Sequence, residues 1–229
     1  MSPGILRGLF CLALMAVVGN TAVAQVPLTQ VDGSRLECPD SLIADCAENL
    51  EKLFNLAHPE IAKRNPDESL SVQMLSGRWV TAENQFSLYD YAIELLQNGR
   101  FLAILSFGEE DLFWKLLDRT TGATFRMEGY PLFSPDGRHV VSAERDEMNL
   151  DALDIYEVRA SGLARVFQAI PPTPSWFPER VCWIDNATIA YTRRAAEDAA
   201  GRVGTPESVA LKSGRWRIEA GGPRCTKPF

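Results

Sequence analysis

Two histidines and several clusters of acidic residues are the side chains of this 229-residue chain that could do chemistry. His58 follows a helical pattern and His139 begins an alternating apolar run, so either is a general base only if the fold brings a nucleophile close to it. The sequence has neither a Gly-x-Ser-x-Gly nucleophile elbow nor a phosphate-binding glycine motif. We therefore favour a non-catalytic protein over the alternative, a small hydrolase-like enzyme with its active site among loops.

Acidic residues gather in three segments that we expect to be loops. They are Glu109, Glu110 and Asp111; Glu144, Asp146, Glu147 and Asp151; and Glu197 and Asp198. Paired carboxylates of this kind serve glycosidases, and a loop over 144–154 could bind calcium, but the D-x-D-x-D-G spacing of a calcium loop is missing. The tight turns between these loops carry basic residues instead, namely Arg100, Arg119, Arg138, Arg159, Lys212 and Arg215. We predict an acidic rim and a basic rim, with the first two acidic loops as candidate binding residues; ordinary solvated surface charge is the alternative.

Cysteine usage points to an oxidising compartment. Four cysteines follow the N-terminal segment, namely Cys38, Cys46, Cys182 and Cys225. An even number in an exported chain indicates two disulfides, and proximity favours Cys38–Cys46 and Cys182–Cys225 among the three possible pairings; reduced, buried thiols are the alternative. No C-x-x-C occurs and both histidines are remote from every cysteine, so we expect no metal site and no cofactor.

Residues 1–24 have the pattern of a cleaved signal peptide. Arg7 precedes an apolar run over 9–18, and Ala22-Val23-Ala24 supplies a small-residue cleavage site. The apolar run is too short for a stable membrane anchor, which is the alternative interpretation. We therefore expect a mature chain from residue 25, in the periplasm of a Gram-negative bacterium or secreted. The whole chain has a net charge of −7, which argues against nucleic acid as a partner.

Hydrophobic periodicity predicts one helix and then strands. A helix over about 41–57, inside a helical insertion over about 40–64, follows from apolar residues at helical spacing. After about residue 70, short alternating runs lie between turn signals and repeat three times as strand, tight turn, strand, longer loop, strand, tight turn, strand. A fourth, degraded copy is indicated because MLSGRWVTAE (74–83) mirrors LKSGRWRIEA (211–220).

We therefore predict a mainly β protein in which residues 25–229 form a single domain of antiparallel four-stranded meanders. The meanders would form a small, about four-bladed β-propeller-like array or an open curved sheet, and a barrel-like meander is a further possibility. An incomplete propeller could also close by oligomerising.

One unit has a recognisable motif. FSPDGRHVVSAERD…LDIYEV…SGLARVFQ, over 133–168, has Phe133 at the end of an inner strand, a Ser-Pro-Asp-Gly-Arg turn, Val140-Val141 in the next strand and Asp-Ile-Tyr in the third. It resembles the repeat of WD-type propellers, and particularly the periplasmic propeller of the Tol envelope system. The resemblance implies blade architecture, although four units are fewer than the six or seven blades usual in those families.

Aromatic residues complete the expectations. We expect the five tryptophans to pack in the core or between units, because a buried tryptophan anchors a small β module. Trp176 and Phe177, inside PPTPSWFPER, are predicted to be exposed binding residues on a loop that prolines hold extended. The predicted function is an exported, non-catalytic envelope module that uses blade edges and loops to contact a protein or a peptidoglycan-associated partner.

Overall fold

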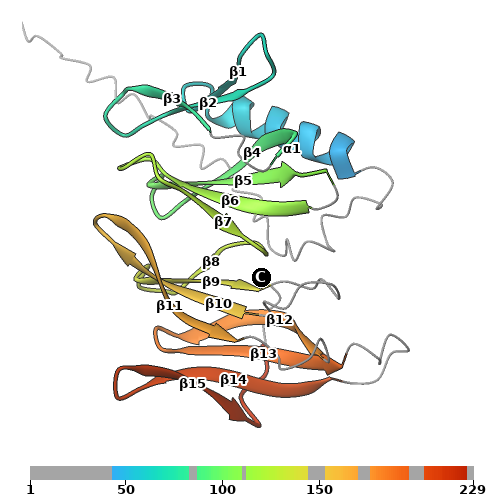
Figure 1. Cartoon of the computed structure of the whole chain (residues 1–229), viewed down its shortest axis with the longest axis vertical. Coiled ribbons are helices and arrows are strands. Elements are labelled where there is room, and N and C mark those ends of the chain that lie inside the picture. The colour runs from blue at the N-terminus through green and yellow to red at the C-terminus, as the bar shows by residue number, and fades with distance from the viewer. Residues whose placement is uncertain are drawn as a thin grey trace, which may run out of the picture.

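The computed structural model describes residues 43–82, 87–109, 112–143, 153–169, 176–195 and 204–225. Within these residues the chain forms one helix followed by fifteen strands, which confirms the predicted mainly β class (Figure 1). Every sheet is an antiparallel meander in which strands adjacent in sequence are adjacent in space.

The strands form one three-stranded and three four-stranded sheets. The first sheet contains β1 (Ala62–Arg64), β2 (Leu70–Gln73) and β3 (Trp79–Thr81). The second contains β4 (Tyr89–Leu96), β5 (Phe101–Phe107), β6 (Leu112–Asp118) and β7 (Thr124–Met127). The third contains β8 (Leu132–Phe133), β9 (His139–Ala143), β10 (Leu153–Arg159) and β11 (Gly162–Ala169). The fourth contains β12 (Trp176–Asp185), β13 (Thr188–Ala195), β14 (Thr205–Lys212) and β15 (Arg215–Ala220).

The four sheets lie one after another in a row, and an apolar seam fills each space between neighbours (Figure 1). Leu70 and Ile104 meet in the first seam, Trp114 and Val140 in the second, and Ile155 and Val209 in the third. The row is open, because the first and last sheets lie at its opposite ends. The described chain therefore forms separate stacked sheets, as expected for propeller-like units, but in an open row rather than a closed ring, a barrel or one curved sheet.

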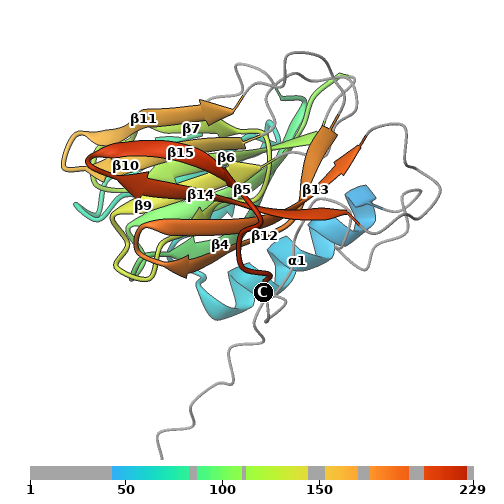
Figure 2. The same cartoon turned by 90° about the horizontal axis from the view of Figure 1, so that it is seen from below.

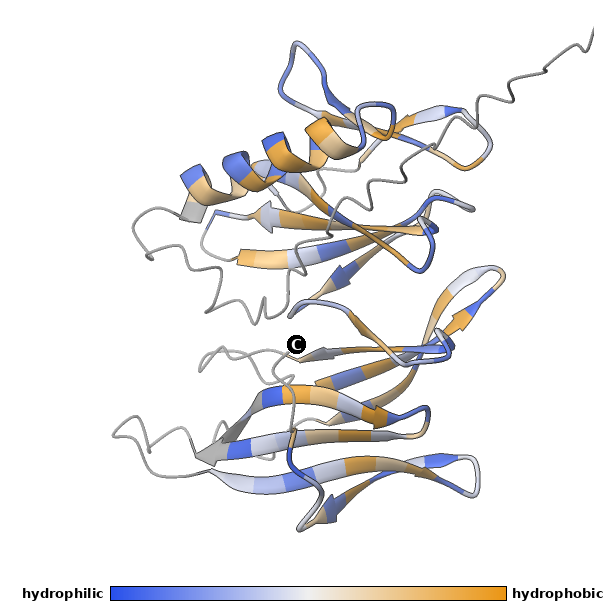
Figure 3. Ribbon diagram, turned by 180° about the vertical axis from the view of Figure 1, so that it is seen from behind, coloured by the Kyte–Doolittle hydropathy of each residue, from blue (hydrophilic) through white to orange (hydrophobic). Residues whose placement is uncertain are grey.

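The helix α1 (Ile43–Ala57) covers the edge of the second sheet that β4 forms (Figure 2). Ala47 belongs to the second seam and Phe54 to the first, so one helix joins two seams. Its hydrophilic and hydrophobic residues alternate around the axis, as expected for an amphipathic helix (Figure 3). The helix is as predicted over the described residues, but β1 lies inside the range 40–64 that we assigned to the helical insertion. Pro59 follows the end of the helix, and the chain becomes extended within a few residues.

The strands run across the row of sheets, and the two sides of the row differ. One side, here called the turn end, has the tight turns, and the other side, here called the loop end, has the ends of the strands that flank the longer loops (Figure 1). The predicted copies share their turn geometry: Gly77 and Gly214, in the two Ser-Gly-Arg-Trp sequences, have φ of +82° and +74°. A residue with a side chain is strained at such φ, so glycine is required at both turns.

Hydrogen bonds between neighbouring sheets join the turn end together. The Arg119 guanidinium is buried and donates to the carbonyl oxygens of Gln73 and Gly99, each at 2.7 Å. Arg100 bonds Asp118 and also donates to the carbonyl of Arg159 in the third sheet, at 2.6 Å. These two arginines, which we assigned to a basic rim, are therefore used inside the stack, while Arg138 remains 81% exposed at its side chain.

A disulfide joins Cys182 to Cys225, which confirms the pairing expected from proximity in the sequence. Cys46 is also disulfide-bonded. Its expected partner, Cys38, lies outside the described residues.

Candidate functional site

The strands that flank the predicted acidic segments in sequence meet at the loop end, where β5, β9 and β13 finish and β6, β10 and β14 begin. Glu109 is described and exposed. The others lie outside the described residues, namely Glu110, Asp111, Glu144, Asp146, Glu147, Asp151, Glu197 and Asp198.

The prediction that Trp176 and Phe177 lie on a loop without a strand partner is wrong. Both begin β12, where Trp176 pairs with Ala195 and Phe177 with Arg194 of β13. The prolines around them do not prevent this, because β12 is an edge strand and one side of its backbone needs no partner.

The described tryptophan side chains mostly pack as expected. Trp114, Trp183 and Trp216 are buried in the seams. Trp79 is half-buried on the outward face of the first sheet, where the Lys63 ammonium lies 4.4 Å from its ring centroid.

An apolar surface that the sequence pattern did not reveal lies at the loop end of the second sheet. Leu88 and Tyr89, where β4 begins, are 59% and 54% exposed. Tyr89 lies directly opposite Phe107 on β5, and the Tyr91 ring meets the Phe107 ring edge-on at 5.6 Å. Leu88 directly precedes β4, and its backbone N–H donates to the Phe107 carbonyl. We call Leu88, Tyr89, Tyr91 and Phe107 the loop-end patch. The alternation of side chains along β4 is enough to place the two tyrosines on one face of the sheet. It does not reveal that this face is uncovered at its end.

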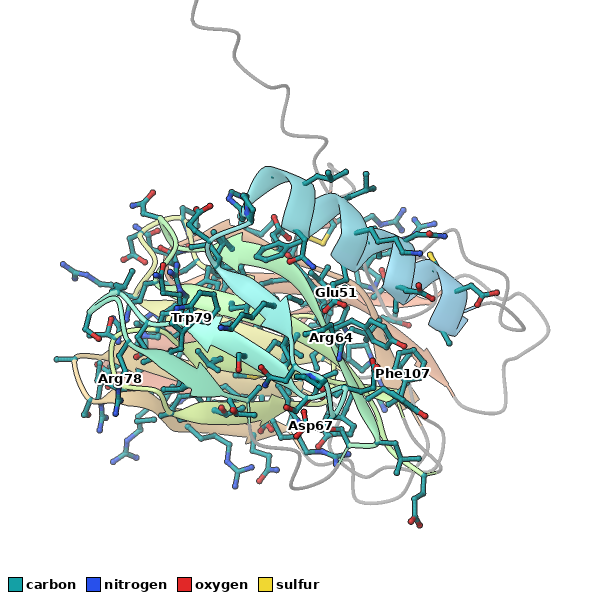
Figure 4. The ribbon with its side chains drawn as sticks, turned by 90° about the horizontal axis from the view of Figure 1, so that it is seen from above. Glu51, Arg64, Asp67, Arg78, Trp79 and Phe107 are labelled. Atoms are coloured by element: carbon teal, nitrogen blue, oxygen red, sulfur yellow. A yellow bond between two sulfur atoms is a disulfide. The ribbon has the colours of Figure 1, made fainter. Side chains whose placement is uncertain are left out.

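An ion pair between Glu51 of the helix and Arg64 of β1 lies beside this patch, next to Tyr91 (Figure 4). Arg64 donates to both carboxylate oxygens of Glu51, each at 2.9 Å, and its guanidinium lies 4.9 Å from the Tyr91 ring centroid. The same pair completes the free edge of β4, because the Ala92 N–H donates to Glu51 at 3.0 Å and Arg64 donates to the Asp90 carbonyl. Glu51 and Arg64 thus supply the acceptor and the donor that a further strand would offer.

The side chains of the patch are uncharged, and the residues around it are acidic. Burial raises the pKa of Tyr91, and the nearby Glu48 and Glu51 act in the same direction against Arg64, so the phenol is a neutral hydrogen-bonding group. A hydrogen bond from Lys52 lowers the pKa of Glu48, so this exposed carboxylate is charged. With Glu109 two residues beyond Phe107, an apolar surface has carboxylates on two sides.

One contact of the second sheet has the residue types of an active site. The Lys115 ammonium lies 2.7 Å from the Ser87 hydroxyl oxygen, which is the pairing of a Ser–Lys nucleophile and base. The same ammonium lies 3.0 and 3.1 Å from the two Asp90 carboxylate oxygens, and both side chains of this ion pair are buried. The Asp90 carboxylate thus holds the ammonium in a buried ion pair, whereas a general base needs a free lone pair aimed at the nucleophile. The cluster is therefore suited to a structural role.

The histidines do not form a catalytic arrangement within the described residues. The His58 ring packs on Phe54, and the His139 ring lies against Trp183 and Trp216. The Nδ1 atom of His139 is buried without a hydrogen-bond partner, and the Ser134 hydroxyl bonds the His139 backbone rather than its imidazole. Across the described ranges, no group of three or more His, Cys, Asp or Glu residues is placed to hold a metal ion.

No described helix combines the length and the apolar character needed to cross a membrane. The sequence matches no protein-family model and no curated protein.

Proposed function

We propose that this protein is a non-catalytic binding module of the bacterial envelope whose loop end holds a segment of a partner protein. One observation carries the proposal: Leu88 and Tyr89 are more than half exposed beside Phe107 and Tyr91, whereas the other described aromatic side chains mainly fill the seams. Tyrosine and phenylalanine are enriched where protein partners bind, because rigid rings bury a large area at low entropic cost.

The strand edges are less suited to binding than the loop end. Glu51 and Arg64 occupy the β4 edge, and β11 and β12 are interrupted by register shifts. The remaining long edge strand, β15, carries Arg215, Arg217 and Glu219. Bulges and charges of this kind prevent another strand from pairing with an edge.

The surroundings of the loop-end patch favour a partner with both apolar and basic residues. Glu48 and Glu109 are exposed beside it, and the Arg64 charge is compensated by Glu51. A small hydrolase-like enzyme is less well supported, because the Ser87–Lys115 contact includes the charge-compensating Asp90.

The proposal is tested by site-specific photo-crosslinking in periplasmic extract. One variant carries a photoreactive residue at Tyr89, and a matched control carries it at Leu75, which is 56% exposed at the turn end. We expect a discrete protein adduct from position 89 that position 75 does not give. The adduct should decrease with added salt, and the substitution Leu88→Ser should reduce it several-fold. Equal adducts from both positions, or none from position 89, would refute the proposed binding surface.

A further inference from the structure

The outward face of the last sheet is covered by the chain's own C-terminal segment. Cross-strand register places Cys182, Ala190 and Ser208 in one row over β12, β13 and β14. The neighbouring row, Trp183, Ile189 and Val209, points the other way into the third seam. The first row therefore lies on the side that no further sheet of the described residues covers.

The covering segment, residues 221–225, follows β15 and is here called the strap. It crosses the outward face toward β12 (Figure 2), where Cys225 is bonded to Cys182. Gly222 lies so close to β14 that an added Cβ would be 2.6 Å from the Ser208 Cβ and 2.8 Å from the Glu207 carbonyl carbon. Beneath the strap, Ala190 and Ser208 are only 0% and 3% exposed.

The strap does for the last sheet what a neighbouring sheet does for the others. A repeat stack must end in a surface that water tolerates, and terminal units are modified to provide one. The first sheet has Lys63, Gln73 and Thr81 on its outward face. The last sheet instead has small residues over which a single extended segment fits.

The disulfide is the main attachment of the strap. Gly221, Pro223 and Arg224 are exposed, and only Gly222 and Cys225 are half-buried. A five-residue segment with so little buried surface has a large conformational entropy to lose and little apolar contact to offset that loss.

We propose that Cys182–Cys225 is a redox latch, and that its reduction releases the strap and uncovers the outward face of the last sheet. A dithiol reductant supplies two electrons and two protons: the Cys182–Cys225 bond breaks, two thiols form, and the reductant becomes a disulfide. In the oxidised chain the face is closed, and in the reduced chain it is open to solvent and to other molecules. This inference does not depend on the proposed function.

The test uses Cys182 as its own reporter. In the mature chain with Cys225→Ser, Cys182 becomes a thiol that is 3% exposed if the strap stays in place. We expect a thiol-reactive probe to label Cys182 within about tenfold of the rate measured after denaturation with guanidinium, because reactivity follows access. Labelling about a thousandfold slower would show that the strap stays seated without its bond, and would overturn the proposal.

Two further measurements separate strap release from misfolding. A chain that ends at Ala220 should have the same urea midpoint and circular dichroism as Cys225→Ser, because an unlatched strap adds little. Trypsin should cleave after Arg224 at least tenfold faster in Cys225→Ser than in the oxidised chain, while cleavage after Arg138 at the turn end serves as the internal reference. Unchanged cleavage after Arg224, or a truncated chain much less stable than Cys225→Ser, would each contradict release.

Discussion

The substitution Glu51→Ala tests whether one helix side chain completes the free edge of β4. Glu51 accepts two hydrogen bonds from Arg64 and one from the Ala92 backbone, and its side chain is 7% exposed. Alanine is the best helix former, so the substitution costs α1 nothing in propensity. Any loss of stability then comes from the lost contacts.

The expected loss is about 3 kcal/mol of unfolding free energy. Leaving the buried Ala92 N–H without an acceptor costs about 1–3 kcal/mol. Removing one partner of a buried ion pair costs about 3–5 kcal/mol, but Arg64 is 25% exposed and recovers part of this cost from water. Glu51→Gln keeps an acceptor for Ala92 and loses only the charge, so we expect about half the loss.

Urea unfolding at pH 7, followed by circular dichroism, measures these differences, with an unchanged m-value as evidence that the same surface is exposed. Glu48→Ala is the matched control, because Glu48 lies one turn earlier in α1 and pairs with Lys52 on the surface. Hydrogen exchange of the Ala92 amide should accelerate in Glu51→Ala and stay unchanged in Glu48→Ala. Equal midpoints for the two alanine variants would refute the edge-completing role.

Two further predictions concern buried charge. Lys115→Met should cost about 4 kcal/mol in the same assay, since it leaves the buried Asp90 side chain without its ion-pair partner. The double variant Lys115→Met with Asp90→Asn should recover part of the loss, and a Lys115→Met variant as stable as wild type would contradict the assignment. Burial raises the pKa of Glu94 in the folded protein. The protonated carboxyl therefore makes its full contribution to the free energy of unfolding below the unfolded-state pKa of 4.5, and this contribution should be lost as the pH rises through the folded-state pKa. Glu94→Gln should abolish this decline in thermal melts, and a variant whose pH profile is identical to that of the wild type would contradict the assignment to Glu94.

The repeating units were predictable because turn chemistry is local. Positive φ at Gly77, Gly137 and Gly214 is required by the tight turns themselves, and the alternation of the flanking residues fixes which side chains share a face. The amphipathic helix was predictable for the same reason, because its apolar residues recur at helical spacing. The Cys182–Cys225 pair has no such local basis, since 43 residues separate the two cysteines; it was expected only from their relative proximity among four cysteines. The loop assigned to Trp176 and Phe177 was wrong, because pairing with β13 depends on partners that proline content does not reveal.

The candidate site was much less predictable. Tyr89 and Phe107 read as ordinary strand residues, and only their place at the uncovered end of a seam makes them a surface. The sequence placed Arg100 and Arg119 on a basic rim, but each donates to a carbonyl oxygen of a neighbouring sheet, Arg100 to the third sheet and Arg119 to the first.

The sequence by itself determined the kind of element, the turn positions and the class of fold, because backbone sterics and side-chain alternation act over a few residues. Only the tertiary structure decided that the row of sheets stays open, that Glu51 and Arg64 complete the edge of β4, and that the strap covers the last sheet. These features depend on which faces meet across tens of residues, and burial at such contacts is a property of the assembled chain rather than of any segment.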